Sequence, residues 1–173
     1  MKLNSIHPFP ARMAPEIVFK ELKGLKASRV VLDPMSGSGT VLRAAAELGH
    51  SAIGFDLDPL AVLMARVWTT PLHAGSLAKA AERLVQKAKI LNGEYLPWID
   101  TCQETEDYIK FWFCGKQIRA LRRLASALTG KSGVLSDAMR IALSRIIITK
   151  ERGASIARDT SHSRPHRVFF CND

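Results

Sequence analysis

Two groups of residues near the start of the chain have the types and the spacing needed to bind a nucleotide-like ligand. The first is a glycine-rich loop, Ser36-Gly37-Ser38-Gly39, and the second is an acid, Asp56, that follows an apolar segment. Glycines at these positions let the backbone approach a ligand closely and adopt positive φ, and the amides that follow can face the ligand. A carboxylate at the end of the next strand can accept hydrogen bonds from both hydroxyls of a ribose.

The elements that must position these groups follow from the surrounding pattern. Residues 30–32 are β-branched or apolar and end at the turn signal Asp33-Pro34, which predicts a buried parallel strand. Thr40 is predicted to cap a helix that ends at Gly49, a residue suited to the left-handed C-terminal position. A second strand is predicted over residues 52–55. The order strand, glycine loop, helix, strand and acid is half of a nucleotide-binding βαβ unit.

The loop sequence narrows the class of ligand. It lacks the Gly-Lys-Ser/Thr of a phosphate loop and the GxGxxG spacing of a dinucleotide fold, which disfavours triphosphate and pyrophosphate ligands. DPMSGSGT followed by GFDLDP resembles the S-adenosylmethionine (SAM) site of class I methyltransferases that act on exocyclic amino groups of nucleic-acid bases, as in restriction-modification systems. The resemblance implies SAM as cofactor, with Asp56 on the ribose, Leu57 on the adenine, and a loop formed by Asp33, Pro34, Met35, Ser36, Gly37, Ser38, Gly39 and Thr40. Asp58, just before Pro59, instead has the features of a helix N-cap. The alternative is an ordinary βαβ connection without a ligand.

The proline-rich segment before the first strand resembles the HPxx(K/R) strap of several amino-methyltransferase families. It reads HPFPARM, and the resemblance implies that His7, Phe9 and Met13 line the amino-acid end of SAM. The alternative is that His7 lies at the surface and Phe9 anchors a loose terminus.

Positive charge is concentrated in the second part of the chain. The formal net charge is +9; residues 1–70 hold eight basic and six acidic side chains, and residues 71–173 hold seventeen and ten, for +2 and +7. This imbalance predicts contact with a polyanion, and we expect DNA. The candidate nucleic-acid contacts are Arg119, Arg122, Arg123, Arg158, Arg164 and Arg167. The alternative is that these residues decorate solvated helix faces.

Composition excludes several classes of protein. The 173 residues, 47% of them hydrophobic, suit one globular domain, and no run predicts a membrane span or a secretory signal. Three cysteines without a CxxC pair predict reduced intracellular thiols, with neither disulfide nor metal, and therefore a cytoplasmic protein.

From residue 76 onward the pattern is helical. Helices are predicted over residues 76–92, over 104–128 with a break at Gly115, and from a Ser136 cap to residue 148. The aromatic cluster before Gly115 is expected in the core, with base stacking as the less favoured alternative; it comprises Tyr108, Phe111, Trp112 and Phe113. Residues 168–171 resemble an unfinished strand and suggest truncation. We expect a SAM-binding half over residues 1–70, a helical insertion over 71–150 and a basic tail over 151–173.

One motif of the resembled family is missing from the sequence. Amino-methyltransferases carry a (D/N/S)PP(Y/F) tetrapeptide that holds the target amino group, and this chain has no Pro-Pro dipeptide. The fold expected is α/β, a Rossmann-like SAM-methyltransferase fold with an incomplete parallel sheet and a helical extension. The function expected is the SAM-binding part of an adenine N6 or cytosine N4 DNA methyltransferase, inactive alone, whose catalytic site is completed by a second chain or a C-terminal part. The alternatives are a non-catalytic module that binds nucleic acid or a partner, and a fragment of an RNA guanine N2 enzyme.

Overall fold

The computed structural model describes residues 6–7, 13–26, 28–93, 95–147, 149, 153–158 and 166–171. The chain forms two compact units, Met1–His73 and Ala74–Asp173. In the described residues, no helix is long and apolar enough to cross a membrane.

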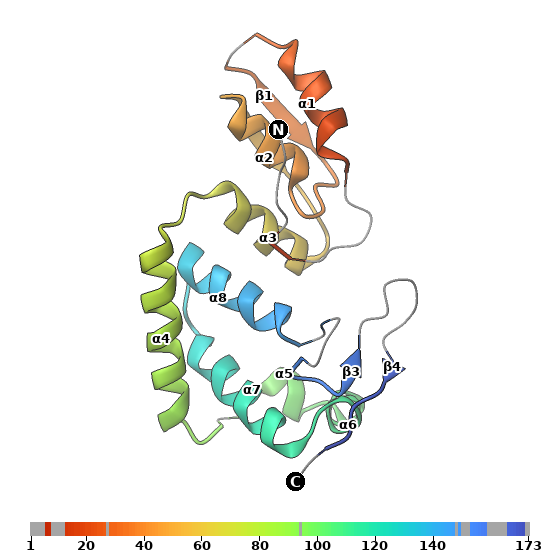
Figure 1. Cartoon of the computed structure of the whole chain (residues 1–173), viewed down its shortest axis with the longest axis vertical. Helices are drawn as coiled ribbons and strands as arrows, with labels where there is room; N and C mark the ends of the chain where they lie inside the picture. The colour runs from red at the N-terminus through yellow and green to blue at the C-terminus, as the bar shows by residue number, and fades with distance from the viewer. Residues whose placement is uncertain are drawn as a thin grey trace. The chain divides into compact units, whose positions relative to one another are not determined.

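The first unit is built around two parallel strands, as the sequence predicts. Its elements are α1 (Pro15–Lys23), β1 (Val30–Asp33), α2 (Thr40–Glu47), β2 (Ser51–Gly54) and α3 (Pro59–Thr69) (Figure 1). β1 pairs with β2 in register from Val30 opposite Ser51 to Asp33 opposite Gly54. Helices α1 and α2 cover one face of this sheet, in a core formed by Val18, Phe19, Leu22, Ala44 and Ala45, against which Val31 and Ala52 pack.

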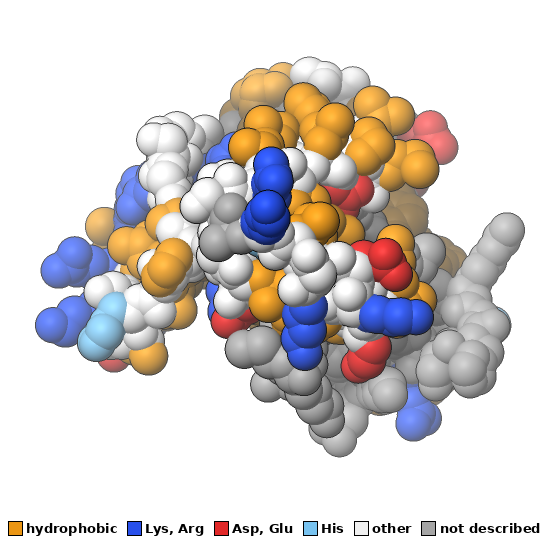
Figure 2. Space-filling view, turned by 90° about the horizontal axis from the view of Figure 1, so that it is seen from above, with side chains coloured by type: hydrophobic (Ala, Val, Ile, Leu, Met, Phe, Trp, Pro, Cys, Tyr) orange, Lys and Arg blue, Asp and Glu red, His pale blue; other side chains and the backbone are white. Residues whose placement is uncertain are grey.

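The other face of the sheet is open, so the prediction of a buried first strand is wrong. Val30 is 67% exposed and Leu32 is 63% exposed, while Ile53 on β2 and Phe55 just after it are 50% and 61% exposed. The alternation of a strand places these four side chains on the face opposite Val31 and Ala52. No described element of this unit covers that face. In Figure 2, hydrophobic side chains lie exposed beside one another over part of the surface.

The ends of α2 and α3 show which turn signals were interpreted correctly. The carbonyl of Gly39 accepts the Arg43 amide at 2.9 Å, so Gly39 is the N-cap of α2 and the predicted Thr40 cap is wrong by one residue. Gly49 has φ +77° just beyond the helix, which confirms the predicted left-handed terminus. Asp58 caps α3 by accepting the Leu60 amide at 2.8 Å, also as predicted.

The second unit is mostly helical, as expected. It contains α4 (Ala74–Ile90), α5 (Pro97–Asp100), α6 (Gln103–Trp112), α7 (Gly115–Leu128), α8 (Val134–Arg145), β3 (Ala157–Arg158) and β4 (His166–Arg167). Helices α4, α7 and α8 pack on one another (Figure 1). α6 ends at Trp112 and α7 begins at Gly115, so the predicted break falls just before Gly115 and not at it. α8 begins after Gly133 and not at the predicted Ser136 cap, and the Ser136 hydroxyl donates to the Ser132 carbonyl.

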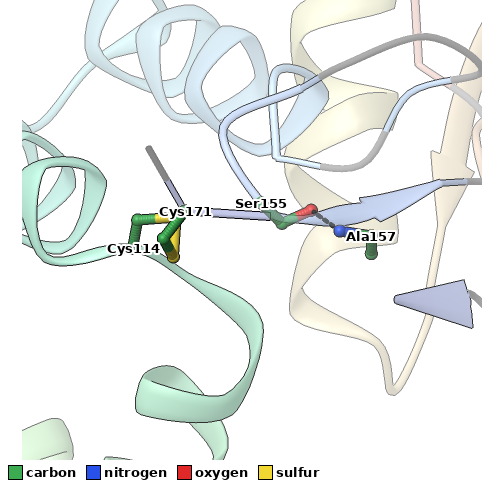
Figure 3. The surroundings of a disulfide bond; sticks show 4 residues. All are labelled: Cys114, Ser155, Ala157 and Cys171. Carbon is green, nitrogen blue, oxygen red and sulfur yellow. Dashed lines mark hydrogen bonds between the residues drawn. A yellow bond between two sulfur atoms is a disulfide. The ribbon is translucent and has the colours of Figure 1, made fainter. Parts of the chain in front are cut away.

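The end of the chain departs most from expectation. β3 and β4 form an antiparallel pair, and residues 168–171 are not a strand. Cys114 and Cys171 form a disulfide with a Cα–Cα distance of 5.5 Å, shown in Figure 3, whereas Cys102 is free and exposed. The prediction of unpaired thiols is therefore wrong for two of the three cysteines, because their pairing depends on a contact between residues 57 positions apart.

Candidate functional site

The glycine loop leaves the carboxyl end of β1 and is held there by backbone hydrogen bonds. The Ser36 amide donates to the Phe55 carbonyl at 2.9 Å, and the Phe55 amide donates to the Asp33 carbonyl at 3.0 Å. These bonds continue the pairing of the two strands beyond the sheet. The loop therefore starts from a fixed position.

Two glycines of the loop are required by its conformation. Gly37 has φ +49° and Gly39 has φ +86°, a region that residues with a side chain rarely adopt. A Cβ atom on Gly39 would lie 2.8 Å from both Cα and Cβ of Ala65 in α3. Gly39 thus serves both the loop turn and the close packing of α2 on α3.

Asp56 connects the loop to the end of the second strand. Its Oδ2 atom accepts the Gly37 amide at 2.7 Å, and its Oδ1 atom accepts the Asp58 amide at 2.9 Å. Hydrogen bonds from the backbone amides of Asp58 and Gly37 lower the pKa of this carboxyl, so it is ionised at neutral pH. Each carboxylate oxygen keeps accepting capacity for one more donor.

A cavity of about 390 Å³ lies beside the loop. Its lining residues are Met13, Asp33, Met35, Ser36, Gly37, Ser38, Thr40 and Val41. The Ser38 Oγ and Thr40 Oγ1 atoms are buried and have no hydrogen-bond partner among the described residues. Buried hydroxyls are nearly always paired, so these two are suited to a polar ligand.

The structure brings together most of the residues predicted to bind the cofactor. Seven of them line the cavity, Gly39 is buried next to it, and Asp56 contacts Gly37 at its edge. Pro34 and Leu57 are exposed, with Leu57 fully in solvent. His7 is half-buried and does not line the cavity, and Phe9 falls outside the described residues. Val41 also lines the cavity and was not predicted as a site residue; its position directly after the loop was the signal that could have found it.

The predicted basic contacts occupy different environments. Arg119, Arg158 and Arg167 are exposed. Arg122 is ion-paired with Asp100, whose Oδ2 atom also accepts the Leu96 amide at 2.7 Å. The hydrogen bond and charge of Asp100 raise the pKa of Arg122, and the hydrogen bond and charge of Arg122 lower the pKa of Asp100. The ion pair joins α5 to α7. Arg123 is half-buried, and Arg164 falls outside the described residues.

Comparison with known proteins identifies the family of the first unit. The DNA methylase family matches residues 5–66, which contain the glycine loop and Asp56. These residues belong to the DNA amino-methyltransferase family. The resemblance predicted from the sequence is thereby confirmed.

Two type II methyltransferases are similar to this chain over longer segments. M.MjaII of Methanocaldococcus jannaschii is 31% identical over 88 residues, which cover 50% of this chain and 17% of that protein. M.MvaI of Kocuria varians is 30% identical over 129 residues, which cover 70% of this chain and 28% of that protein. The match thus spans less than a third of either relative. No solved structure is significantly similar to the chain.

Proposed function

We propose that this chain is the SAM-binding part of a DNA methyltransferase that acts on an exocyclic amino group, adenine N6 or cytosine N4. The observation that carries this proposal is the hydrogen bond from the Gly37 amide to Asp56 at the edge of a cavity with two unpaired hydroxyls. The sequence family, with its type II relatives, supports the reaction class. The parallel strand pair with helices on one face supports a Rossmann-like arrangement.

The residues of the site fit SAM by their chemistry. The charged oxygens of Asp56 would accept the ribose hydroxyls, Leu57 would contact the adenine, and Ser38 and Thr40 would hydrogen-bond polar groups of the ligand. Met13 and Met35 would give the cavity an apolar wall, and His7 and Phe9 would approach the amino-acid end. SAM supplies an electrophilic methyl group on a sulfonium. The contribution of this chain is to bind and orient it.

We further propose that this chain transfers no methyl group by itself. The tetrapeptide that would hold the target amino group does not occur in the sequence. The residues that hold the base would come from a second chain or from another part of a longer protein. DNA is the proposed substrate, and an RNA guanine N2 target is the alternative.

SAM binding to the purified chain, measured by calorimetry, tests the proposal. We expect saturable binding by wild type, and at least tenfold weaker binding by Asp56→Ala and Asp56→Asn. Asp58→Asn is the matched control, because it changes an acid two residues away and keeps an N-cap side chain. A folded chain that gives no binding, or Asp56 variants that bind as tightly as the control, would overturn the proposal.

A second candidate function is a non-catalytic module that holds nucleic acid. It is favoured by the charge of residues 74–173, which hold seventeen basic and ten acidic side chains. Oligonucleotide binding without SAM binding would support it over the first.

A further inference from the structure

Aromatic side chains of α6 form a surface in the second unit. The expectation that the aromatic cluster lies in the core is wrong for Tyr108 and Phe111, which are exposed, whereas Trp112 and Phe113 are half-buried. Tyr108 is 59% exposed and Phe111 is 50% exposed. The rings of Phe111 and Trp112 meet edge to face with 4.9 Å between their centroids. The ring centroids of Tyr108 and Trp112 are 6.3 Å apart. The Arg167 guanidinium lies over the Phe111 ring at 5.0 Å. We call Tyr108, Phe111, Trp112 and Arg167 the aromatic surface.

Arg167 is brought to this surface by fixed contacts of the C-terminal segment. The Ile156 amide donates to the Trp112 carbonyl at 2.9 Å, and the amides of Val168 and Phe169 donate to the Ile156 carbonyl at 3.1 Å. Ile156 is 2% exposed, and the disulfide ties Cys171 to the residue that precedes α7 (Figure 3). The cation and the rings are therefore positioned together on one folded scaffold.

The combination of rings and cation indicates the chemistry of a ligand. Large aromatic rings normally contribute to stability by burial, so an exposed group of them marks an interaction site. A guanidinium adds stacking and hydrogen bonds to phosphate. Single-stranded nucleic acid presents both partners, because unpaired bases have free π faces and are linked by phosphates.

The charges around the aromatic surface indicate on which side the phosphates of a bound nucleic-acid strand would lie. The first half of α6 carries three acids, Glu104, Glu106 and Asp107. Lys110 forms an ion pair with Glu106, with 3.2 Å between Nζ and Oε2. Arg167 lies toward the other end of the helix, where Phe111 and Trp112 are. The phosphates should therefore pass on the β4 side.

We propose that the aromatic surface binds unpaired bases of single-stranded nucleic acid, with a base stacked on the exposed Tyr108 ring and a phosphate at Arg167, whose guanidinium Phe111 holds by its cation–π contact. The proposal rests on the proposed function only in taking nucleic acid as the polymer. It adds a base-binding site separate from the residues that would hold SAM.

Fluorescence anisotropy with a labelled single-stranded oligonucleotide tests this site in the full chain. We expect Phe111→Leu, Tyr108→Ala and Arg167→Gln each to weaken binding about fivefold or more, since stacking on one aromatic is worth ~1–3 kcal/mol per base. Leu at position 111 keeps an apolar side chain and removes only the ring. The controls are Tyr95→Ala, which removes an equally exposed ring outside the surface, and Lys89→Gln, which removes an exposed charge on α4. We expect both controls to stay within twofold of wild type.

A second measurement separates stacking from charge. An oligonucleotide of the same length with abasic positions should bind wild type as weakly as the intact oligonucleotide binds Tyr108→Ala, and a duplex of the same sequence should compete poorly. Equal binding of intact and abasic strands, preference for duplex, or variants as tight as the controls would overturn the proposal. So would variants that lose only self-association, because the surface would then be a protein contact.

Asp56→Ala should bind the oligonucleotide like wild type, and Phe111→Leu should bind SAM like wild type, so this proposal and the proposed function can fail separately.

Discussion

The Asp56 carboxylate accepts the Gly37 amide at 2.7 Å, which joins the end of the second strand to the middle of the glycine loop. The second carboxylate oxygen accepts the Asp58 amide, and Asp58 in turn caps α3. One acid thus fixes the loop and the start of the next helix relative to each other. The predicted ribose ligand, Asp56, and the middle of the glycine loop are therefore positioned by the same hydrogen bonds.

This arrangement predicts how the first unit responds to acid. The amides of Asp58 and Gly37 lower the folded-state pKa of Asp56 below its ordinary value of 3.8. A carboxyl with a lowered folded pKa stabilises the fold above its unfolded pKa, and this contribution is lost as the pH falls through the folded pKa. Wild type should therefore melt at a higher temperature than Asp56→Asn at pH 7, and this difference should shrink as the pH falls below 3.8 toward the lowered folded pKa. Melting curves between pH 3 and 7 measure this, and a constant difference down to pH 3 would contradict it.

Gly39→Ala should destabilise the first unit more than Gly49→Ala does. Both glycines have positive φ, but a Cβ at Gly39 would lie 2.8 Å from Ala65, whereas a Cβ at Gly49 meets open space. We expect a loss of about 1–2 kcal/mol at Gly49 from the left-handed backbone alone. At Gly39, overpacking should add about 1–3 kcal/mol to that loss. Urea unfolding measures both variants, and equal losses would show that α3 moves away without cost.

The comparison of sequence and structure separates local signals from long-range ones. The left-handed end at Gly49 and the Asp58 cap were predictable because each depends on a few neighbouring residues. The parallel pairing of the two strands was predictable, because a helix connects one strand to the next. Exposure of Val30 and Leu32 was not predictable, because an apolar strand looks the same whether or not another element covers it. The position of Arg167 over Phe111 depends on contacts across 56 residues, which no local pattern encodes.

The disulfide should contribute strongly to the stability of the second unit. It joins residues with a sequence separation of 57, and a disulfide typically stabilises the folded protein by about 2–4 kcal/mol. Cys114→Ser and Cys171→Ser should each lose about this amount in denaturant unfolding. Cys102→Ser should be neutral, because that thiol is exposed and outside the disulfide. Thiol titration of the native protein should find one reactive group before reduction and three after it; three before reduction would falsify the pairing.

The open face of the sheet should make the isolated chain self-associate. Val30, Leu32, Ile53 and Phe55 are each at least half exposed, and exposed apolar patches of this kind promote association. Within the described residues β1 pairs only with β2, so its outer edge also offers unpaired backbone groups. Leu32→Lys should shift sedimentation toward the monomer, because a charge on this face opposes its burial. Ile17→Lys is the matched control, since Ile17 is 56% exposed but lies on α1. A wild-type chain that stays monomeric as its concentration rises would show that the open face does not drive association.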